Sequence, residues 1–334
     1  MYAMRLNQHK SISTSPLRWT DVPMPTPGKL ELRIKVRCCA ICRTDLHVIE
    51  GELPRRDLPI IPGHQIVGVI DELGSGCRRL ELGQRVGVAW LRSTCGSCAY
   101  CKRGQENLCL AARFTGYDAH GGYAEYAIVP EAFAYAVPDV FADVEAAPLL
   151  CAGIIGYRSL ARAEVPDGGR LLMVGFGSSA HIVMQIARHR GYEVYVATRG
   201  EKHRELARQL GAVWVGESPA DVPVKVNSAI IFAPVGDLVP PVLEQLDRGG
   251  TLALAGIYMT DVPTLDYEKH LFYERQVRSV TCNTRADGEA LLAEAAAIPI
   301  RPHTTIYPLR EANRALQDLN ADRIQGTGVL RIGD

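Results

Sequence analysis

Residues 170–180, RLLMVGFGSSA, decide the fold of this chain. Four apolar residues, 171–174, lead into Gly175-Phe176-Gly177-Ser178-Ser179-Ala180, and the amphipathic segment HIVMQIARHRG follows. In such a segment Gly175 permits a tight turn, Gly177 leaves space for a pyrophosphate, and Ala180 lets the helix pack closely on the sheet. The phosphates would lie at the helix N-terminus, where free N–H groups favour anions. The pattern predicts a strand, a turn and a helix that bind a dinucleotide; the alternative is an ordinary glycine-rich turn.

Strand and helix patterns continue to alternate after this stretch. The segments 192–199 (YEVYVATR), 227–234 (NSAIIFAP) and 251–257 (TLALAGI) have strand character, and 201–211 (EKHRELARQLG) has helix character. Strands that alternate with helices form a parallel sheet with helices on both faces. We therefore expect an α/β domain in the second half of the chain.

About the first 150 residues have a different pattern of apolar runs and of Gly and Pro. Short β-like runs such as 30–41 (LELRIKVRCCAI) and 64–74 (HQIVGVIDELG) are separated by Gly and Pro, which is typical of a compact, mainly β domain. Residues 305–332 predict a strand, a helix and a second strand. With 334 residues, of which 47% are apolar, the chain is long enough for two domains with full cores.

Composition excludes several classes of function. The chain has 37 Lys and Arg against 37 Asp and Glu, so it lacks the basic excess of a nucleic-acid-binding protein. No apolar run approaches the roughly 18 residues of a membrane-spanning helix. The N-terminal MYAMRLNQHKSIST has neither a signal-peptide core nor a lipidation motif. We expect a cytoplasmic protein that binds neither nucleic acid nor membrane.

Ten cysteines are the unusual feature of the composition. Without an export signal, metal ligation or catalysis is a better interpretation than disulfides. Four of them share the spacing C-x2-C-x2-C-x7-C: Cys95, Cys98, Cys101 and Cys109. The two-residue gaps turn successive thiolates toward one point, and four sulfurs complete the tetrahedral shell of a structural zinc. An iron–sulfur cluster is the alternative, but its usual cysteine runs are spaced differently.

The choice of dinucleotide is expected at the end of the next strand, about twenty residues after the glycines. A domain that prefers NAD commonly has Asp or Glu there, whereas this chain has Thr198-Arg199-Gly200 and no acid before Glu201. Arg199 could bind a 2′-phosphate, with Thr198 as a second donor. We therefore expect NADP(H) to be favoured over NAD(H); the alternative is that Arg199 is a solvated surface charge.

Three further residues have the chemistry of a catalytic metal site. Cys42 follows an apolar strand, His64 lies in the segment PGHQ (62–65), and Cys151 lies in an apolar run. Taken singly, Cys151 is more simply a small buried side chain, and His64 a satisfied core histidine. Two thiolates and one imidazole together, however, make a catalytic zinc shell that leaves the fourth position open.

Together these motifs resemble those of the zinc-dependent medium-chain alcohol dehydrogenases. The matching pieces are CRTDLH (42–47), GHQ (63–65), the four-cysteine loop, LLCAG (149–153) and GFGSSA (175–180), in the family's order and at its spacings. The resemblance implies a GroES-like β-barrel catalytic domain made of residues 1–152 and 298–334. It also implies a Rossmann dinucleotide-binding domain inserted at residues 153–297, and hydride transfer between an alcohol and NAD(P).

The resemblance carries the metal ligands over by position. Cys42, His64 and Cys151 would hold a catalytic zinc, so that two zinc ions are expected per chain, one catalytic and one structural. Asp45 matches the carboxylate that orients the histidine ligand and raises its basicity. Zinc would lower the pKa of the alcohol, and the resulting alkoxide would donate hydride to the nicotinamide.

Proton transfer and cofactor contacts are also implied by the resemblance. Thr44 would hydrogen-bond the zinc-bound alcohol and pass its proton toward His47 through the cofactor ribose. Arg43 matches the position that contacts the cofactor pyrophosphate. The family further implies a homotetramer or a homodimer.

Two departures from the family pattern concern the zinc and the pyrophosphate. The family commonly has Gly-His-Glu, whereas Gln65 here is neutral and removes one negative charge behind the zinc, which could make the metal a stronger Lewis acid. Relatives often have an arginine near the final strand for the pyrophosphate. This chain has Thr327 there, with Arg323 nearby.

The third departure concerns the substrate pocket. Ethanol specialists crowd the pocket with tryptophans just after the C-x-T-D-x-H motif, whereas Ile49 and Leu53 occupy that stretch here and Trp90 remains. A moderately open apolar pocket lined by Trp90, Leu53 and Phe114 fits longer aliphatic or aromatic primary alcohols and their aldehydes. The alternative is that these are plain core residues.

Other functions fit parts of the pattern. A polyol or secondary-alcohol dehydrogenase of the same superfamily often has a Glu as its third zinc ligand, where this chain has Cys151. A non-catalytic nucleotide-binding regulator, or a zinc-ribbon interaction module, would not need the second ligand set. The cysteines that match no ligand position are expected to be buried structural thiols: Cys38, Cys39, Cys77 and Cys282.

Overall fold

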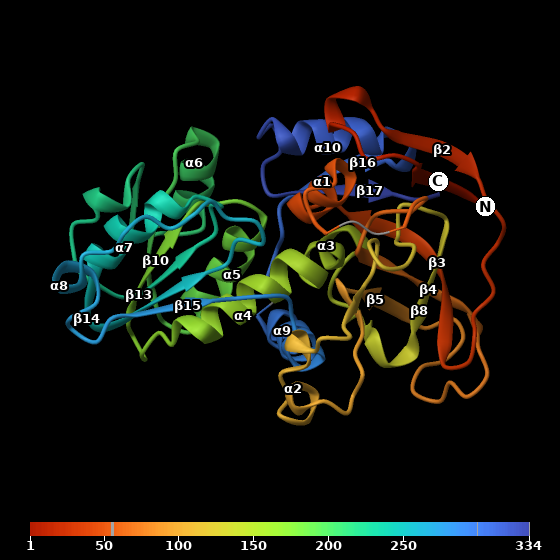
Figure 1. Ribbon diagram of the computed structural model, residues 1–334, viewed down its shortest axis with the longest axis horizontal. Helices are drawn as coiled ribbons and strands as arrows, with labels where there is room; N and C mark the ends of the chain where they lie inside the picture. Colours follow the sequence, from red (N-terminus) through yellow and green to blue (C-terminus); the bar gives the residue numbers. More distant parts are fainter. Residues whose placement is uncertain (55–56, 299, 334) are drawn as a thin grey trace. The chain divides into compact units, whose positions relative to one another are not determined.

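The computed structural model describes residues 1–54, 57–298 and 300–333, which fold as two compact units (Figure 1). The first unit is Met1–Cys151 with Cys282–Asp334, and the second is Ala152–Thr281. The first boundary lies one residue before the expected one. The second compact unit ends at Thr281, whereas the expected domain boundary lies after residue 297.

Helix α9 (Arg285–Ala297) accounts for this difference, because contacts with distant residues hold it in the first unit. The Arg285 guanidinium donates to both carboxylate oxygens of Glu106 at 2.7–3.1 Å and lies 4.7 Å from the ring centroid of Phe133. The ring of Tyr135 packs so closely on Gly288 that a Cβ there would come within 2.5 Å of it. These contacts could not be predicted from the alternation of strand and helix patterns in the sequence.

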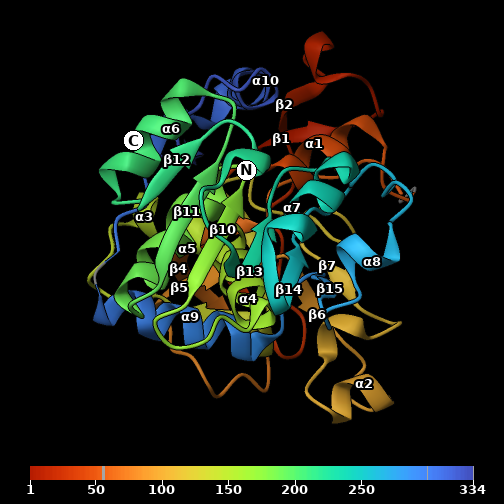
Figure 2. The ribbon, with the colours of Figure 1, turned by 90° about the vertical axis from the view of Figure 1, so that its left-hand side faces the viewer.

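The unit Ala152–Thr281 is built on a parallel sheet, seen in Figure 2. Its strands, in the order in which they lie side by side, are β12 (Trp214–Gly216), β11 (Glu193–Ala197), β10 (Arg170–Val174), β13 (Val226–Ile231), β14 (Leu246–Leu254) and β15 (Gln276–Ser279). Numbered along the chain, this order is 3-2-1-4-5-6, that of a doubly wound dinucleotide-binding sheet. The predicted α/β domain is therefore confirmed.

Helices cover both faces of this sheet. They are α4 (Ile154–Ala163), α5 (Ser178–His189), α6 (Glu201–Gln209) and α7 (Val239–Gln245), and the short α8 (Tyr267–His270) contacts α7. Leu172 and Val174 of β10 pack in one cluster with Val239 of α7. Their neighbours Leu171 and Met173 point to the opposite face and are also fully buried. A strand buried on both faces needs consecutive apolar residues, which explains the run LLMV at 171–174.

The first unit is mainly β. Its largest sheet runs β16 (Thr304–Pro308), β17 (Thr327–Arg331), β3 (Glu31–Ala40), β4 (Gln65–Leu73), β5 (Arg85–Val88) and β9 (Ala134–Ala136), and β8 (Tyr126–Pro130) also pairs with β3. Two smaller sheets are β1 (Tyr2–Leu6) with β2 (Leu17–Asp21), and β6 (Leu91–Ser93) with β7 (Arg113–Phe114). Alternate residues of β3 are buried, namely Leu32, Ile34 and Val36, as the period of a half-buried strand requires.

Short helices complete the first unit. Besides α9 they are α1 (Arg43–Glu50), α2 (Ala99–Lys102), α3 (Asp143–Pro148) and α10 (Ala312–Asn320). The last of these lies between β16 and β17 in the chain, so the predicted strand, helix and strand near the C-terminus are confirmed.

One helical stretch, 143–163, runs from α3 through the π-helical turn Leu149–Gly153 into α4. By length and composition this stretch could cross a membrane, which corrects the expectation that no apolar run is long enough. However, 61% of its most apolar window is buried inside the structure, as in the core helix of a folded domain.

Candidate functional site

The first candidate site begins at the N-terminus of α1. The Cys42 sulfur accepts a hydrogen bond from the Thr44 N–H at 3.3 Å, and the Cys42 N–H donates to Asp45 Oδ2 at 2.8 Å. These reciprocal bonds form a capping box, which fixes the Cys42 sulfur at the start of the helix. The free N–H groups of a helix start favour a thiolate over a thiol.

His64 is completely buried, and both of its ring nitrogens are engaged. Nδ1 lies 3.1 Å from Asp45 Oδ1, and Nε2 lies 3.3 Å from the Cys42 sulfur. Cys151, from the π-helical turn, completes the group: its sulfur, the Cys42 sulfur and a His64 nitrogen all lie within 4.8 Å of one another. A histidine with one nitrogen on a carboxylate and the other toward thiolates has the arrangement typical of a metal ligand.

The side chains of this group shift the pKa values of one another. A hydrogen bond from Cys151 and the charge of His64 lower the pKa of the Cys42 thiol well below its ordinary value, although burial opposes them. Burial alone would lower the pKa of His64, but the charges of Asp45 and Cys42 outweigh it and raise that pKa to about 10. The Cys151 thiol behaves in the opposite way, because its hydrogen bond to Cys42 and its burial raise its pKa well above the ordinary value. Two sulfurs with one imidazole are nevertheless a donor set that suits zinc.

The four cysteines of the 95–109 loop also come together. Their sulfurs are 3.5 Å apart for Cys95 and Cys109, 3.6 Å for Cys98 and Cys101, and 3.9 Å for Cys95 and Cys101. Sulfurs placed tetrahedrally at about 2.3 Å from zinc are about 3.8 Å from one another, so the loop fits this metal. The backbone N–H groups of Ser97 and Cys98 help to lower the pKa of Cys95 to about 6, which favours its thiolate.

Thr44 and His47 lie three residues apart on α1 and therefore on the same side of the helix. Thr44 is buried, and His47 Nδ1 contacts the carboxylate of Glu52. Sequence reasoning missed Glu52. It reaches His47 only because the chain turns back at Gly51, whose φ of +79° is left-handed, and a spacing of five residues carries no helical signal.

The arginines considered for the pyrophosphate differ in their surroundings. Arg43, the first residue of α1, is exposed. Arg323 instead donates to Asp318 at 2.8 Å, and Thr327 is buried in β17. Arg323 is therefore already paired with a carboxylate. The Arg43 side chain is exposed and has no ion-pair partner among the described residues, so it is the better candidate for binding the pyrophosphate.

The predicted pocket residues Leu53, Trp90 and Phe114 belong to one apolar cluster beside His64. The Trp90 ring lies edge-on to His64 with centroids 4.9 Å apart, and it stacks on Phe114 at 5.0 Å. The cluster also contains three residues that sequence reasoning did not single out: Val48, Tyr117 and Cys282. Val48 could have been found, since it follows Thr44 by one helical turn, whereas nothing in the sequence marks the other two. Ile49 lies instead in the main core.

In the second unit, the turn between β10 and α5 has the predicted conformation. Gly175 has a φ of +84°, which other residues rarely adopt, and Gly177 is the N-cap of α5. A Cβ at Gly177 would meet nothing within 4 Å, so the space beside it is open. Phe176 and Ala180 are buried, which anchors the turn and packs the helix. The N-terminus of α5, beginning with Ser178 and Ser179, is thus available to an anion.

The end of β11 carries the residues expected to choose the cofactor. Thr198 is buried and Arg199 is exposed. Sequence reasoning missed Arg204, whose guanidinium donates to the carbonyl oxygens of Thr198 at 3.3 Å and Arg199 at 2.7 Å. The same guanidinium pairs with Glu201 and Glu217, so it fixes the strand end and neutralises the nearest acid.

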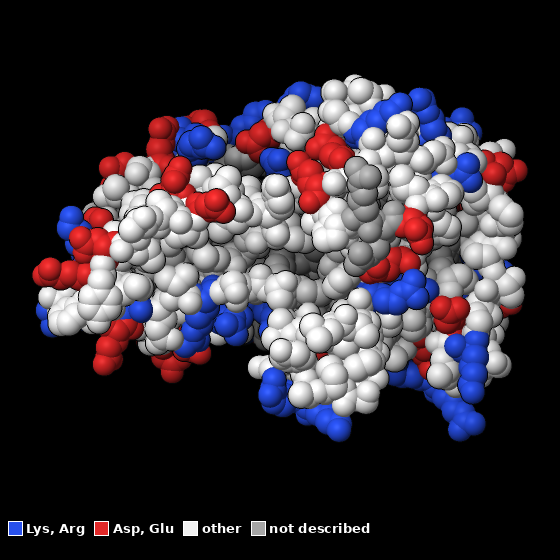
Figure 3. All heavy atoms as spheres, viewed as in Figure 1, with Lys and Arg blue, Asp and Glu red and all other residues white. Residues whose placement is uncertain are grey.

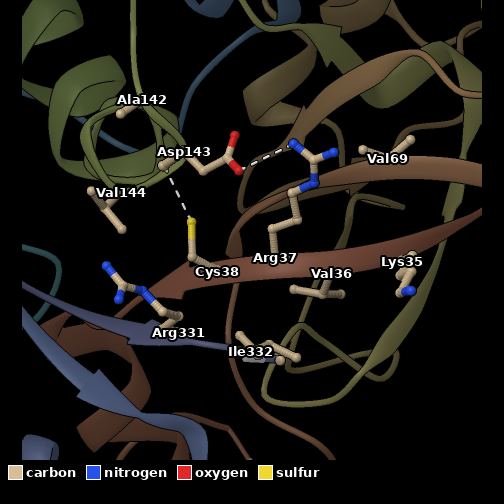
Figure 4. A pocket seen from close by; sticks show the side chains of 11 residues that line it. Lys35, Val36, Arg37, Cys38, Val69, Ala142, Asp143, Val144, Arg331 and Ile332 are labelled. Atoms are coloured by element: carbon tan, nitrogen blue, oxygen red, sulfur yellow. Dashed lines mark hydrogen bonds and ion pairs between the residues drawn. The ribbon is translucent and has the colours of Figure 1, made fainter.

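Of the cysteines without a metal role, Cys38 and Cys39 are buried as expected, whereas Cys77 and Cys282 are only partly buried. The register of β3 shifts between Val36 and Cys38, as at a β-bulge, and Arg37 and Cys38 both reach Asp143 (Figure 4). The Cys38 thiol donates to the Asp143 carbonyl at 3.2 Å and Arg37 to its carboxylate at 3.3 Å. The 730 Å³ hollow drawn there contains none of the predicted site residues.

The chain is similar to known dehydrogenases over nearly its whole length. Residues 28–139 match the family described as alcohol dehydrogenase GroES-like domain, and residues 179–297 match the zinc-binding dehydrogenase family. Probable alcohol dehydrogenase AdhA of Mycobacterium tuberculosis is 53% identical over 337 residues, which cover 99% of this chain and 97% of that protein.

Solved structures agree with these matches. A cinnamyl alcohol dehydrogenase of Sorghum bicolor has a TM-score of 0.90 at 26% identity, covering 99% of this chain and 97% of that one. Acetophenone reductase of Geotrichum candidum, solved in complex with NAD, has a TM-score of 0.89 at 25% identity with the same coverage.

The chain therefore belongs to the zinc-dependent medium-chain dehydrogenase/reductase family. The predicted GroES-like catalytic domain and Rossmann-type nucleotide-binding domain are confirmed. The protein is an oxidoreductase of the zinc-type alcohol dehydrogenases, which uses zinc and a nicotinamide cofactor and acts on small alcohols or aldehydes.

Proposed function

We propose that this enzyme interconverts primary aliphatic or aromatic alcohols and their aldehydes at the group formed by Cys42, His64 and Cys151, with NADP(H) as the favoured cofactor. One observation carries the proposal. Two sulfurs and an imidazole meet at a buried point, with the Asp45 carboxylate behind His64 and the Trp90 ring beside it. A metal site built only to hold a fold needs neither the apolar wall nor an open ligand position.

The chain would hold two zinc ions. Cys42, His64 and Cys151 would hold the catalytic ion, and the cysteines of the 95–109 loop would hold the structural one. When bound, the catalytic zinc supplies a Lewis acid for the substrate oxygen, and the nicotinamide accepts or donates the hydride. The buried, neutral Gln65 next to His64 adds no further negative charge to this site.

The chain's own residues would orient the ligands and move the proton. Asp45 accepts from His64 Nδ1 and so keeps Nε2 turned toward the sulfurs. The Thr44 hydroxyl, two residues after the Cys42 cap, would hold the proton of the substrate hydroxyl. His47, which contacts the Glu52 carboxylate, would receive that proton.

The apolar cluster would set the choice of substrate. Trp90, Phe114 and Leu53 form a wall beside His64, and this wall would exclude water from the reacting atoms. A flat ring or a long alkyl chain would bury apolar area against it, which ethanol is too small to do.

The cofactor preference rests on the end of β11. Arg199 is exposed there, and the nearest acid, Glu201, is neutralised by Arg204 and Arg208. A free guanidinium is suited to bidentate binding of a 2′-phosphate. The residues of the 175–180 turn would bind the cofactor phosphates, and Arg43 is proposed as a contact of the pyrophosphate from the family pattern.

We also propose that the protein works in the cytoplasm as a homotetramer or homodimer. Its substrates would be small molecules, and the protein would bind neither nucleic acid nor membrane. The formal net charge of zero supports the absence of nucleic-acid and membrane binding. The face shown in Figure 3, where basic and acidic side chains are interspersed, supports it as well.

A substrate and cofactor panel on the zinc-loaded enzyme tests the proposal. We expect kcat/KM for benzyl alcohol and hexanol to exceed that for ethanol by about tenfold or more, as one well-filled apolar pocket allows. We also expect NADP to be used better than NAD, and Arg199→Ala to reduce kcat/KM for NADP about tenfold or more while sparing NAD. If ethanol is the best substrate, the open pocket is wrong, and if wild type prefers NAD, the role of Arg199 is wrong.

A further inference from the structure

Residues 114–119 form a loop that closes on itself and packs against the backbone of the candidate site. Hydrogen bonds of 2.8 and 2.9 Å join Phe114 and Asp118 across the loop. Gly116 has a φ of +75°, and a Cβ there would come within 2.9 Å of the backbone of Gly63, the residue before the buried histidine. The loop is therefore held directly beside the metal-binding group.

This loop fixes the indole ring that faces His64. Tyr117, in the middle of the loop, stacks on Trp90 with ring centroids 5.7 Å apart and an angle of 25° between the rings. Phe114 stacks on the same indole at 5.0 Å, and the Thr115 N–H donates to the Trp90 carbonyl at 2.9 Å. The Trp90 ring, edge-on to His64, is thus backed by two rings and one backbone bond from the loop.

The Tyr117 hydroxyl reaches a third segment, the turn that follows helix α1. Tyr117 is only 8% exposed, and its hydroxyl donates to the carbonyl oxygen of Pro54. Leu53, the residue before Pro54, packs against the cluster that contains Tyr117 and Trp90. The hydroxyl therefore joins the segment that carries Leu53 to the wall formed by Trp90.

This hydrogen bond takes the one backbone group through which Pro54 can be held. Proline has no N–H, so its carbonyl oxygen is its only backbone hydrogen-bonding atom. Helix α1 ends at Glu50, and Leu53 lies beyond it in irregular backbone. The place of the Leu53 side chain consequently depends on contacts with other segments, and the bond from Tyr117 is the polar one among those described here.

We propose that Tyr117 is a positioning residue that sets substrate choice, because its hydroxyl fixes Pro54 and so holds Leu53 against the Trp90 wall. Tyr117 acts through Leu53, whose place decides how wide an apolar group fits beside His64. The inference rests on the proposed function, in which alcohols bind at this wall.

Substrate selectivity tests this role in Tyr117→Phe, which removes the hydroxyl and keeps the stacked ring. The ratio of kcat/KM for 2-naphthylmethanol to that for benzyl alcohol should rise about three- to tenfold, the effect of one neutral hydrogen bond. The reason is that Leu53 can then give way to the wider ring. For ethanol, which is too small to need the wall, kcat/KM should stay within about twofold of wild type. Zinc content should be unchanged.

Tyr307→Phe is the matched control. It also removes the hydroxyl of a tyrosine that is 8% exposed, and that hydroxyl donates to Asp318 at 2.9 Å, outside the cluster around Trp90. The ratio should equal that of wild type. A rise as large as that in Tyr117→Phe would show that loss of any buried hydroxyl loosens the pocket, and the proposal would be wrong.

A double-mutant cycle with Leu53→Ala shows whether Tyr117 acts through this side chain. Leu53→Ala alone should raise the ratio, and Tyr117→Phe should then add little to it. An unchanged ratio in Tyr117→Phe, or effects that multiply in the double variant, would overturn the proposal. Wild type that does not oxidise benzyl alcohol, by contrast, would refute the proposed function itself.

Discussion

The two groups of metal-binding side chains differ in how they are assembled and in what surrounds them. The four cysteines come from one short segment, 95–109, and Cys95 is exposed. The other group gathers Cys42, His64 and Cys151 from three distant segments, and His64 is fully buried. A loop that supplies all four ligands needs no other segment to form its metal site, whereas a site assembled from three segments can be given supporting and wall residues. This difference supports the proposal that the buried group is the catalytic site and the 95–109 loop the structural one.

The largest expected effect comes from breaking the buried group. Cys42→Ser should lose one zinc ion and several kcal/mol of transition-state stabilisation. We expect kcat/KM to fall by about a thousandfold or more. The fold should remain, because the 95–109 loop keeps its own ligands. Steady-state kinetics with benzyl alcohol and NADP, together with circular dichroism, measure both effects. Activity within about tenfold of wild type would refute the ligand assignment.

The opposite pattern is expected when the loop is broken. Cys98→Ser should release the structural zinc and lower Tm by about 5–10 °C, since each kcal/mol shifts Tm by about 2–4 °C in a protein of this size. At a temperature well below unfolding, kcat should stay within about fivefold of wild type, because the loop touches no reacting atoms. Differential scanning calorimetry and kinetics check this. Cys77→Ser, a thiol outside both groups, is the control, and an unchanged Tm in Cys98→Ser would contradict the structural role.

A change in the wall of the buried group should alter substrate choice without removing metal. Trp90→Ala shortens the side chain that lies edge-on to His64. The ratio of kcat/KM for 2-naphthylmethanol to that for benzyl alcohol should rise about tenfold, with zinc content unchanged. If both substrates lose activity equally, Trp90 is a core residue and not a wall of the pocket.

The smallest expected effect concerns the ion pair between Glu106, in the 95–109 loop, and Arg285, at the start of α9. Burial opposes ionisation of Glu106, but hydrogen bonds and the charge of Arg285 outweigh it and hold the pKa of Glu106 below its ordinary 4.5. A carboxyl group with a lowered folded-state pKa stabilises the fold above its unfolded pKa and loses that contribution as the pH falls through the folded value.

Glu106→Gln should therefore destabilise the protein by about 1–3 kcal/mol at neutral pH. The difference from wild type should shrink once the pH falls below 4.5, the ordinary pKa of the group. Urea unfolding of both proteins across this pH range measures the effect. A difference that stays constant or grows in acid would show that the carboxylate charge is not what binds α9 to the loop.

Features set by neighbouring residues could be predicted from the sequence. The spacing of Cys95, Cys98, Cys101 and Cys109 is itself the geometry of a metal loop, and the structure brings their sulfurs together. The turn at Gly175 was equally readable, because a strand, two glycines and an amphipathic helix define it locally. The group of Cys42, His64 and Cys151 needed the family resemblance, since no local spacing connects these residues.

Features that depend on long-range packing could not be predicted. Tyr117 and Cys282 join the wall around Trp90 from segments whose sequences look like ordinary loops. Helix α9 follows a strand, as in an α/β domain, yet contacts with Glu106 and Tyr135 place it in the first unit. In each case the deciding contact joins residues far apart in the chain, and a single sequence does not record it.

The most direct test of two metal sites with different tasks is the zinc content per chain of three proteins measured side by side by native mass spectrometry. We predict two zinc ions in wild type and one each in Cys42→Ser and Cys98→Ser, with activity lost only in the first variant. A single zinc ion in wild type, or two in Cys42→Ser, would contradict the division of the cysteines between a catalytic and a structural site.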